Sequence, residues 1–174
     1  MLAAIVMVIT STLPVQAQDT AAHKDSTAVQ PPTIEQVRYM EGLKTVTRGL
    51  AQIRDGLNRV ARTQSADSLT RRRAARRLGG LCGTARSFIV SGRPRMQPVA
   101  YNDSLRILAK QLTTRLDSLT AALPACEKTA GRDPNGVATN LNTRLKNYDD
   151  ALLAFRTAQA SQGKPDSSKV SSSQ

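Results

Sequence analysis

A seam of apolar residues between Tyr39 and Val60 is the feature that most constrains the fold of this 174-residue chain. The apolar side chains recur at alternating steps of four and three residues, at Tyr39, Leu43, Val46, Leu50, Ile53, Leu57 and Val60. This spacing places them in one stripe of a long α-helix that packs against neighbouring helices. Thr33 follows Pro32 and can cap that helix, which we therefore expect over about residues 34–63.

Three further segments carry a similar apolar stripe. We expect a second helix over about 66–91, a third over about 102–123 that Pro124 stops, and a fourth over about 137–160. Only 3% of the residues are aromatic, which disfavours a β-sandwich or a barrel. The sequence therefore predicts an all-α fold, an up-down-up-down four-helix bundle that forms one domain over residues 34–160.

Glycines interrupt two of these predicted helices. One set recurs every seven residues beside the first seam, and either it permits close helix packing or it is tolerated on an exposed face. A second set, in the predicted second helix, could kink or split that helix. The two sets are Gly42, Gly49 and Gly56, and Gly79, Gly80 and Gly83.

The two ends of the chain differ in composition from the predicted bundle. Residues 1–17 hold no charged side chain and begin with a short apolar run, so we expect a signal peptide and a mature chain that starts at Gln18. The alternative is a buried or fraying N-terminal segment. Residues 18–33 and 161–174 are small and polar, which predicts disordered tails. The mature chain contains no candidate transmembrane span, and we expect it in the periplasm or secreted.

The two cysteines are Cys82 and Cys126. An even count in an exported chain favours a disulfide, and the alternative is two separate buried thiols. In a simple hairpin of the second and third helices, however, the two positions would be offset along the axis by on the order of 20 Å at about 1.5 Å per residue. A bridge then requires that the 124–135 loop folds back along the bundle, or that the second helix restarts at its glycines.

The formal charge of +12 is concentrated in the first predicted hairpin. Residues 34–95 carry a net charge of +10, against +3 for residues 96–174. The densest part of this region is Arg71, Arg72, Arg73, Arg76 and Arg77. Guanidinium groups one helical turn apart, such as Arg72 with Arg76 and Arg73 with Arg77, can grip phosphate or carboxylate oxygens.

This cluster predicts an anion-binding surface, and the alternative is a solvated helix face. Candidate partners in an envelope compartment are an anionic lipid, lipopolysaccharide, an acidic polymer or an acidic envelope protein. Nucleic acid fits the charge but not the export signal, and the cluster lacks aromatic residues for base stacking.

The sequence contains no recognisable catalytic set. His23 is the only histidine, and there is no phosphate-binding glycine loop and no Ser-His-Asp combination. We therefore expect no enzymatic activity, no metal site and no cofactor. Asp149 and Asp150 are adjacent, point in different directions on a helix, and are expected to pair with Lys146 or Arg144, or with the basic hairpin across the bundle.

The exported bundle resembles the soluble cytochromes of the b562 type in its architecture. In that family a Met near the start of the first helix and a His in the fourth helix bind haem. Met40 stands about where the Met should be, but Asp149 stands near the position of the His. The resemblance therefore implies no haem binding by that scheme.

From these observations we expect an exported, non-enzymatic helical bundle that binds an anionic envelope component or an acidic partner through its arginine-rich hairpin. Two alternatives stay open. One is a structural or assembly subunit that pairs through a helix seam, and the other is a carrier of a ligand in the bundle core.

Overall fold

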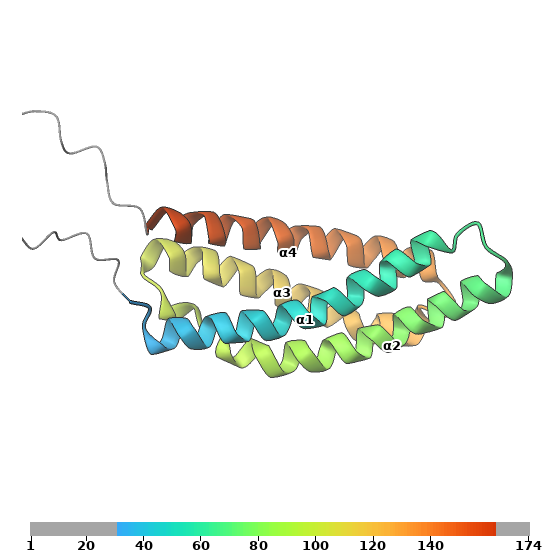
Figure 1. The fold of residues 1–174 in the computed structure, drawn as a ribbon, viewed down its shortest axis with the longest axis horizontal. Coiled ribbons are helices and arrows are strands. Elements are labelled where there is room, and N and C mark those ends of the chain that lie inside the picture. The colour runs from blue at the N-terminus through green and yellow to red at the C-terminus, as the bar shows by residue number, and fades with distance from the viewer. Residues whose placement is uncertain (1–30, 163–174) are drawn as a thin grey trace, which may run out of the picture.

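The computed structural model describes residues 31–162. The predicted signal peptide and most of both predicted tails lie outside this range. The described residues form a four-helix bundle in which α1 and α3 run one way and α2 and α4 run the other (Figure 1), which confirms the predicted all-α fold. The elements are α1 (Ile34–Arg62), α2 (Ser68–Gly92), the short 3₁₀ helices η1 (Arg93–Arg95) and η2 (Pro98–Ala100), α3 (Asp103–Thr129) and α4 (Pro134–Gln162).

The seam of α1 faces the core. All seven of its apolar residues are buried, and Thr33 caps the helix as predicted by accepting a hydrogen bond from the Gln36 backbone N–H at 3.2 Å. The Gln36 side chain in turn accepts a hydrogen bond from the Thr33 backbone N–H, which completes a capping box.

The third and fourth helices are longer than the sequence predicts. Pro124 does not stop α3, which continues to Thr129. Proline removes one backbone hydrogen bond, but Leu123 and Cys126 on either side of it are buried and hold this last stretch against the core. The fourth helix begins at Pro134 and not near 137, because proline is favoured in the first turn of a helix.

The remaining boundaries differ by a few residues. The second helix begins at Ser68 and not at 66, because Asp67 serves as its N-cap. No break occurs at Gly79, Gly80 or Gly83, so the expected split of the helix at these glycines is wrong. Residues 161–162, predicted as part of a tail, belong to α4.

Glycines bring α1 and α2 into close contact, as the close-packing interpretation predicts. A methyl group added at Gly42 would lie 2.7 Å from the Gly92 carbonyl oxygen, and one added at Gly49 would lie 2.9 Å from the Ala85 carbonyl oxygen. Such distances leave no room for a side chain, so these glycines set the spacing of the first hairpin.

Large aromatic side chains fill the core near the end of the bundle where α1 begins. The rings of Tyr39, Tyr101 and Phe155 pack with centroids 5.0 to 5.5 Å apart. The Tyr39 hydroxyl donates a hydrogen bond to the Ala109 carbonyl oxygen at 3.5 Å. Burial raises the pKa of Tyr39, and it raises the pKa values of Tyr101 and Tyr148 to about 12.

A disulfide between Cys82 and Cys126 joins α2 to α3, with 6.2 Å between their Cα atoms. Neither of the two routes expected from the sequence is used. Instead, residues 93–102 carry the chain further along the bundle axis after α2 ends, so that α3 starts beyond that end (Figure 1). This extra advance removes the offset of the simple hairpin and brings both cysteines to the same level.

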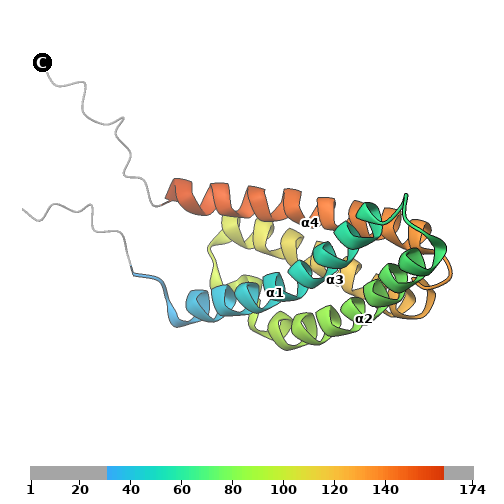
Figure 2. The same ribbon diagram turned by 45° about the vertical axis from the view of Figure 1, so that its right-hand side comes forward.

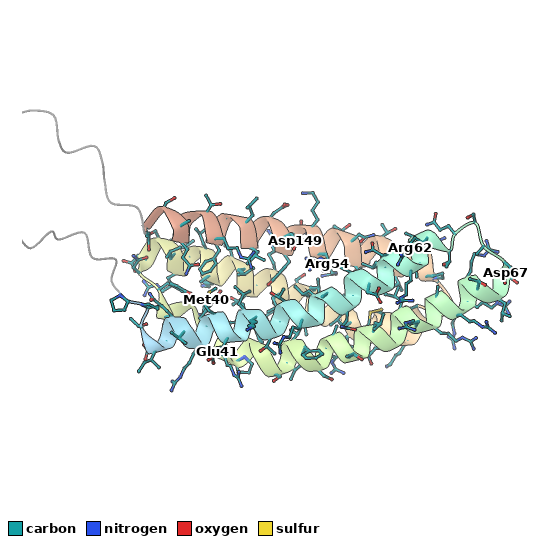
Figure 3. The ribbon with its side chains drawn as sticks, in the orientation of Figure 1. Met40, Glu41, Arg54, Arg62, Asp67 and Asp149 are labelled. Carbon is teal, nitrogen blue, oxygen red and sulfur yellow. A yellow bond between two sulfur atoms is a disulfide. The ribbon has the colours of Figure 1, made fainter. Side chains whose placement is uncertain are left out.

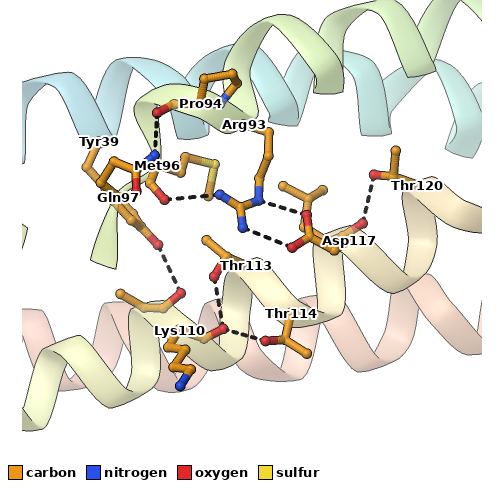
Figure 4. Close-up of polar contacts among 12 residues, drawn as sticks. Tyr39, Arg93, Pro94, Met96, Gln97, Lys110, Thr113, Thr114, Asp117 and Thr120 are labelled. Carbon is orange, nitrogen blue, oxygen red and sulfur yellow. Dashed lines mark hydrogen bonds and ion pairs between the residues drawn. The ribbon is translucent and has the colours of Figure 1, made fainter. Parts of the chain in front are cut away.

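A bidentate ion pair fixes the start of this connection (Figure 4). Arg93 donates from Nε to Asp117 Oδ1 at 2.7 Å and from Nη2 to Oδ2 at 2.9 Å. The hydrogen bond to Asp117 raises the pKa of Arg93. Gln97 Nε2 donates to the Pro94 carbonyl oxygen at 2.8 Å, and Met96 is buried beneath the connection. The ion pair holds the connection against α3, and the hydrogen bond between Gln97 and Pro94 fixes its internal conformation.

Candidate anion-binding site

All five arginines singled out in the sequence lie in the first three turns of α2 and are exposed. The helix begins there because the Asp67 carboxylate accepts hydrogen bonds from the backbone N–H groups of Leu69 and Thr70, at 2.9 and 3.0 Å. Hydrogen bonding, above all from the Thr70 side chain, lowers the pKa of Asp67. On the inner side of the same turns, Ala74, Ala75 and Leu78 are buried against the core.

None of these five arginines is within ion-pair distance of a carboxylate on residues 31–162. The ion pairs in this range involve other cations, namely Arg54, Arg59, Arg93, Arg106 and Lys146. One of the five makes a contact with the neighbouring loop, a hydrogen bond from Arg71 Nη1 to the Gln64 carbonyl oxygen at 3.5 Å. Their positive charge is therefore not neutralised by the described part of the chain.

A shallow cleft between α1 and α2 gathers four arginines. It is lined by Arg59 and Arg62 from the last turns of α1 and by Arg73 and Arg77 from α2. Arg59 also pairs with Asp55 at 3.0 Å. Arg73 and Arg77 thus share a cleft, as their spacing of one turn predicts.

A second cleft lies on the other side of α2, where the α1–α2 loop approaches the α3–α4 loop. Arg71 and Arg72 line it together with Arg132 of the α3–α4 loop. Arg76 lines neither cleft, so the predicted pair of Arg72 with Arg76 does not form one side of a cleft.

The two clefts show that the arginines do not occupy one face of the helix. Successive residues on a helix differ in direction by about 100°, so Arg71, Arg72 and Arg73 alone spread over more than half of its circumference. We call residues 59–77 together with Arg132 the arginine tip. In Figure 3, Arg62 and Asp67 mark this end of the molecule.

Sequence reasoning missed Arg59, Arg62 and Arg132. The first two are present in the basic hairpin, and the expectation of a tight turn after the first helix could have placed them opposite Arg73 and Arg77. No signal of this kind exists for Arg132, because its position depends on how the α3–α4 loop packs against the first hairpin.

The acidic pair of α4 makes separate contacts, as predicted. Asp149 pairs with Arg54 of α1 at 2.5 Å, and Asp150 pairs with Lys146 at 2.8 Å (Figure 3 labels the first pair). Because Asp149 is engaged with Arg54, and Met40 is 38% exposed, the two positions compared with haem ligands do not come together in the core.

The apolar seam of α1, considered above for pairing with another chain, packs against the other helices of the same chain. Leu43, Leu50 and Leu57 are buried in the bundle and present no surface to a partner.

Two negative findings apply to residues 31–162. No group of three or more His, Cys, Asp or Glu side chains in this range is arranged to hold a metal ion. None of its helices has an apolar stretch long enough to cross a membrane.

The chain matches no protein-family model, no curated protein and no solved structure.

Proposed function

We propose that this protein is an exported, non-enzymatic helical bundle that binds an anionic partner through its arginine tip. The observation that carries the proposal is the set of five exposed arginines of α2 that have no carboxylate partner on residues 31–162. Concentrating like charges at one end of a small domain opposes folding through repulsion, and an anionic ligand relieves that repulsion.

Two further features support the proposal. The tip draws arginines from α1, α2 and the α3–α4 loop, so binding groups that are distant in sequence are held by one rigid scaffold. The disulfide supports an oxidising compartment, which is consistent with export by the predicted signal peptide.

The test compares two variants that remove the same charge from different places. The tip variant replaces Arg72, Arg73, Arg76 and Arg77 by Gln. The control variant replaces four exposed arginines outside the tip, Arg38, Arg86, Arg115 and Arg156, by Gln. Binding to heparin and to anionic liposomes is measured from low salt to physiological ionic strength.

We expect the unmodified protein and the control variant to stay bound at physiological ionic strength. The tip variant should no longer bind under these conditions. Equal losses in the two variants would mean that only net charge matters. Absence of binding by the unmodified protein at low salt would rule out the proposal.

A further inference from the structure

We propose that the arginine tip docks end-on onto the surface of a lipid bilayer that carries anionic phosphate headgroups, with Leu69 entering the interface. This inference rests on the proposed function and names the partner and the orientation. It begins from an exposed apolar side chain with cationic neighbours: Leu69 lies in the first turn of α2, just before the arginines, and is 52% exposed.

Leu69 and Arg76 lie on the outward face of α2, with Arg72 to one side of them, toward one cleft, and Arg73 to the other side, toward the other cleft. Arg72, Arg73 and Arg76 follow Leu69 by three, four and seven residues, the spacing of one helix face. The buried residues Ala75 and Leu78 lie on the opposite side of these turns. An exposed apolar side chain close to several arginines is typical of a segment that enters a membrane interface. There the aliphatic parts of the arginine side chains lie along apolar groups, and their guanidinium groups reach the phosphates.

The distribution of charge favours an end-on approach. A linear polyanion that followed one side of α2 would reach one cleft and leave the other unoccupied. A plane laid across the end of the bundle is within reach of both clefts, because Arg62, Arg71 and Arg132 come from three different segments at this end. In Figure 1 the α1–α2 hairpin also extends further along the long axis than the α3–α4 loop, so this end meets a flat surface first.

Acidic groups oppose this approach only weakly. Residues 59–77 hold seven arginines and one carboxylate, Asp67, and Arg132 is followed by the exposed Asp133, so eight arginines face two carboxylates. The Asp67 oxygens accept hydrogen bonds from Leu69, Thr70 and the Thr70 hydroxyl. A bilayer rich in phosphates therefore meets a surface that is predominantly cationic.

The chain contains no tryptophan, so a single introduced tryptophan reports its own environment. We compare Leu69→Trp with Val90→Trp. Both positions are exposed, at 52% and 59%, and lie on α2 roughly 31 Å apart along the axis at about 1.5 Å per residue. Each full-length, disulfide-bonded variant is mixed with phosphatidylcholine vesicles, with and without phosphatidylglycerol, and its fluorescence and co-flotation are recorded.

With the anionic vesicles we expect both variants to float, and only the Leu69→Trp emission to move to shorter wavelength and to be quenched by brominated lipid. Combining Leu69→Trp with the four tip substitutions to Gln should weaken vesicle binding on the order of 100-fold or more, because each arginine near an anionic surface contributes several-fold. Vesicles of phosphatidylcholine alone should leave both spectra unchanged.

Other outcomes overturn the inference in distinguishable ways. A shift at Val90→Trp would mean that the side of α2, or the opposite end, meets the bilayer. Flotation with no shift at either position would mean that the tip does not enter the interface. Binding to heparin but not to vesicles would be consistent with the proposed function and would rule out a lipid surface as the partner. Binding to neither would rule out both proposals.

Discussion

Replacing Gly49 by Ala tests whether close packing sets the geometry of the first hairpin. The added methyl group would lie 2.9 Å from the Ala85 carbonyl oxygen and 2.9 Å from Phe88 Cβ. Neither atom is the free end of a flexible side chain, so α1 and α2 must move apart. Overpacking of this kind costs about 1 to 3 kcal/mol, and the gain in helix propensity on replacing glycine offsets about 1 kcal/mol.

Gly80→Ala is the matched control. Gly80 lies in the interior of α2, is exposed, and has no atom within 4 Å of the position where a methyl group would be added. Here only the propensity gain remains, so the free energy of unfolding should rise by about 1 kcal/mol. The same substitution should therefore have opposite signs at Gly49 and Gly80.

Urea unfolding followed by circular dichroism at 222 nm measures both changes. We expect Gly49→Ala to lower the free energy of unfolding by up to about 2 kcal/mol, with an unchanged dependence on urea concentration. If Gly49→Ala stabilises the protein as much as Gly80→Ala does, the close contact between α1 and α2 is not what determines the packing.

Three further predictions concern stability and titration. Removing the disulfide by replacing Cys82 and Cys126 with Ala should lower the free energy of unfolding by about 4 kcal/mol, because the bridge closes a loop of 44 residues, and urea unfolding measures this loss. Asp67→Ala should destabilise α2 at neutral pH, whereas Asp67→Asn should retain most of the cap. Because the folded pKa of Asp67 is lowered, the charge-dependent part of its stabilising effect is present above the unfolded pKa and is lost as the pH falls through the folded value. In thermal melts the advantage of the unmodified protein over Asp67→Ala should therefore shrink in acid to the advantage that Asp67→Asn shows. The three tyrosines all have raised pKa values, so absorbance at 295 nm should show almost no phenolate near pH 10 in the folded protein, whereas in guanidinium chloride the tyrosines should titrate with a midpoint near pH 10.

The architecture follows from local patterns that the sequence displays. The seam of α1 and the cap at Thr33 depend on neighbours within one or two helical turns, so they are readable before any tertiary contact is known. Pro124 is different. Its usual effect on a helix is overridden because the buried residues around it, including the disulfide-bonded Cys126, hold the last turns in place.

The path of residues 93–102 could not be predicted either. The path depends on the ion pair between Arg93 and Asp117, which are 24 residues apart. It also depends on the burial of Met96, which is itself a residue of the connection. That path decides whether the two cysteines lie at the same height along the bundle axis. The disulfide could therefore be predicted from the cysteine count and the compartment, but not the chain path that brings the two cysteines together.

The candidate site was predictable only in part. The five arginines of α2 are visible as a run in the sequence, but a run does not show how the side chains are divided around the helix. Their separation into two clefts depends on which sides of α2 are covered by α1 and by the α3–α4 loop. The sequence therefore indicates the charge of the tip, and the tertiary structure determines its shape.

The position of the disulfide also determines what a protease can release. Residues 93–102 are the polypeptide link between the α1–α2 hairpin and the α3–α4 hairpin, and the exposed side chain of Val99 lies within it. After a single cut at this connection, the Cys82–Cys126 bond is the remaining covalent link between the two hairpins. The nicked protein should migrate as one species on a non-reducing gel and as two after reduction, so a gel run without reductant would not reveal a cleavage in this segment.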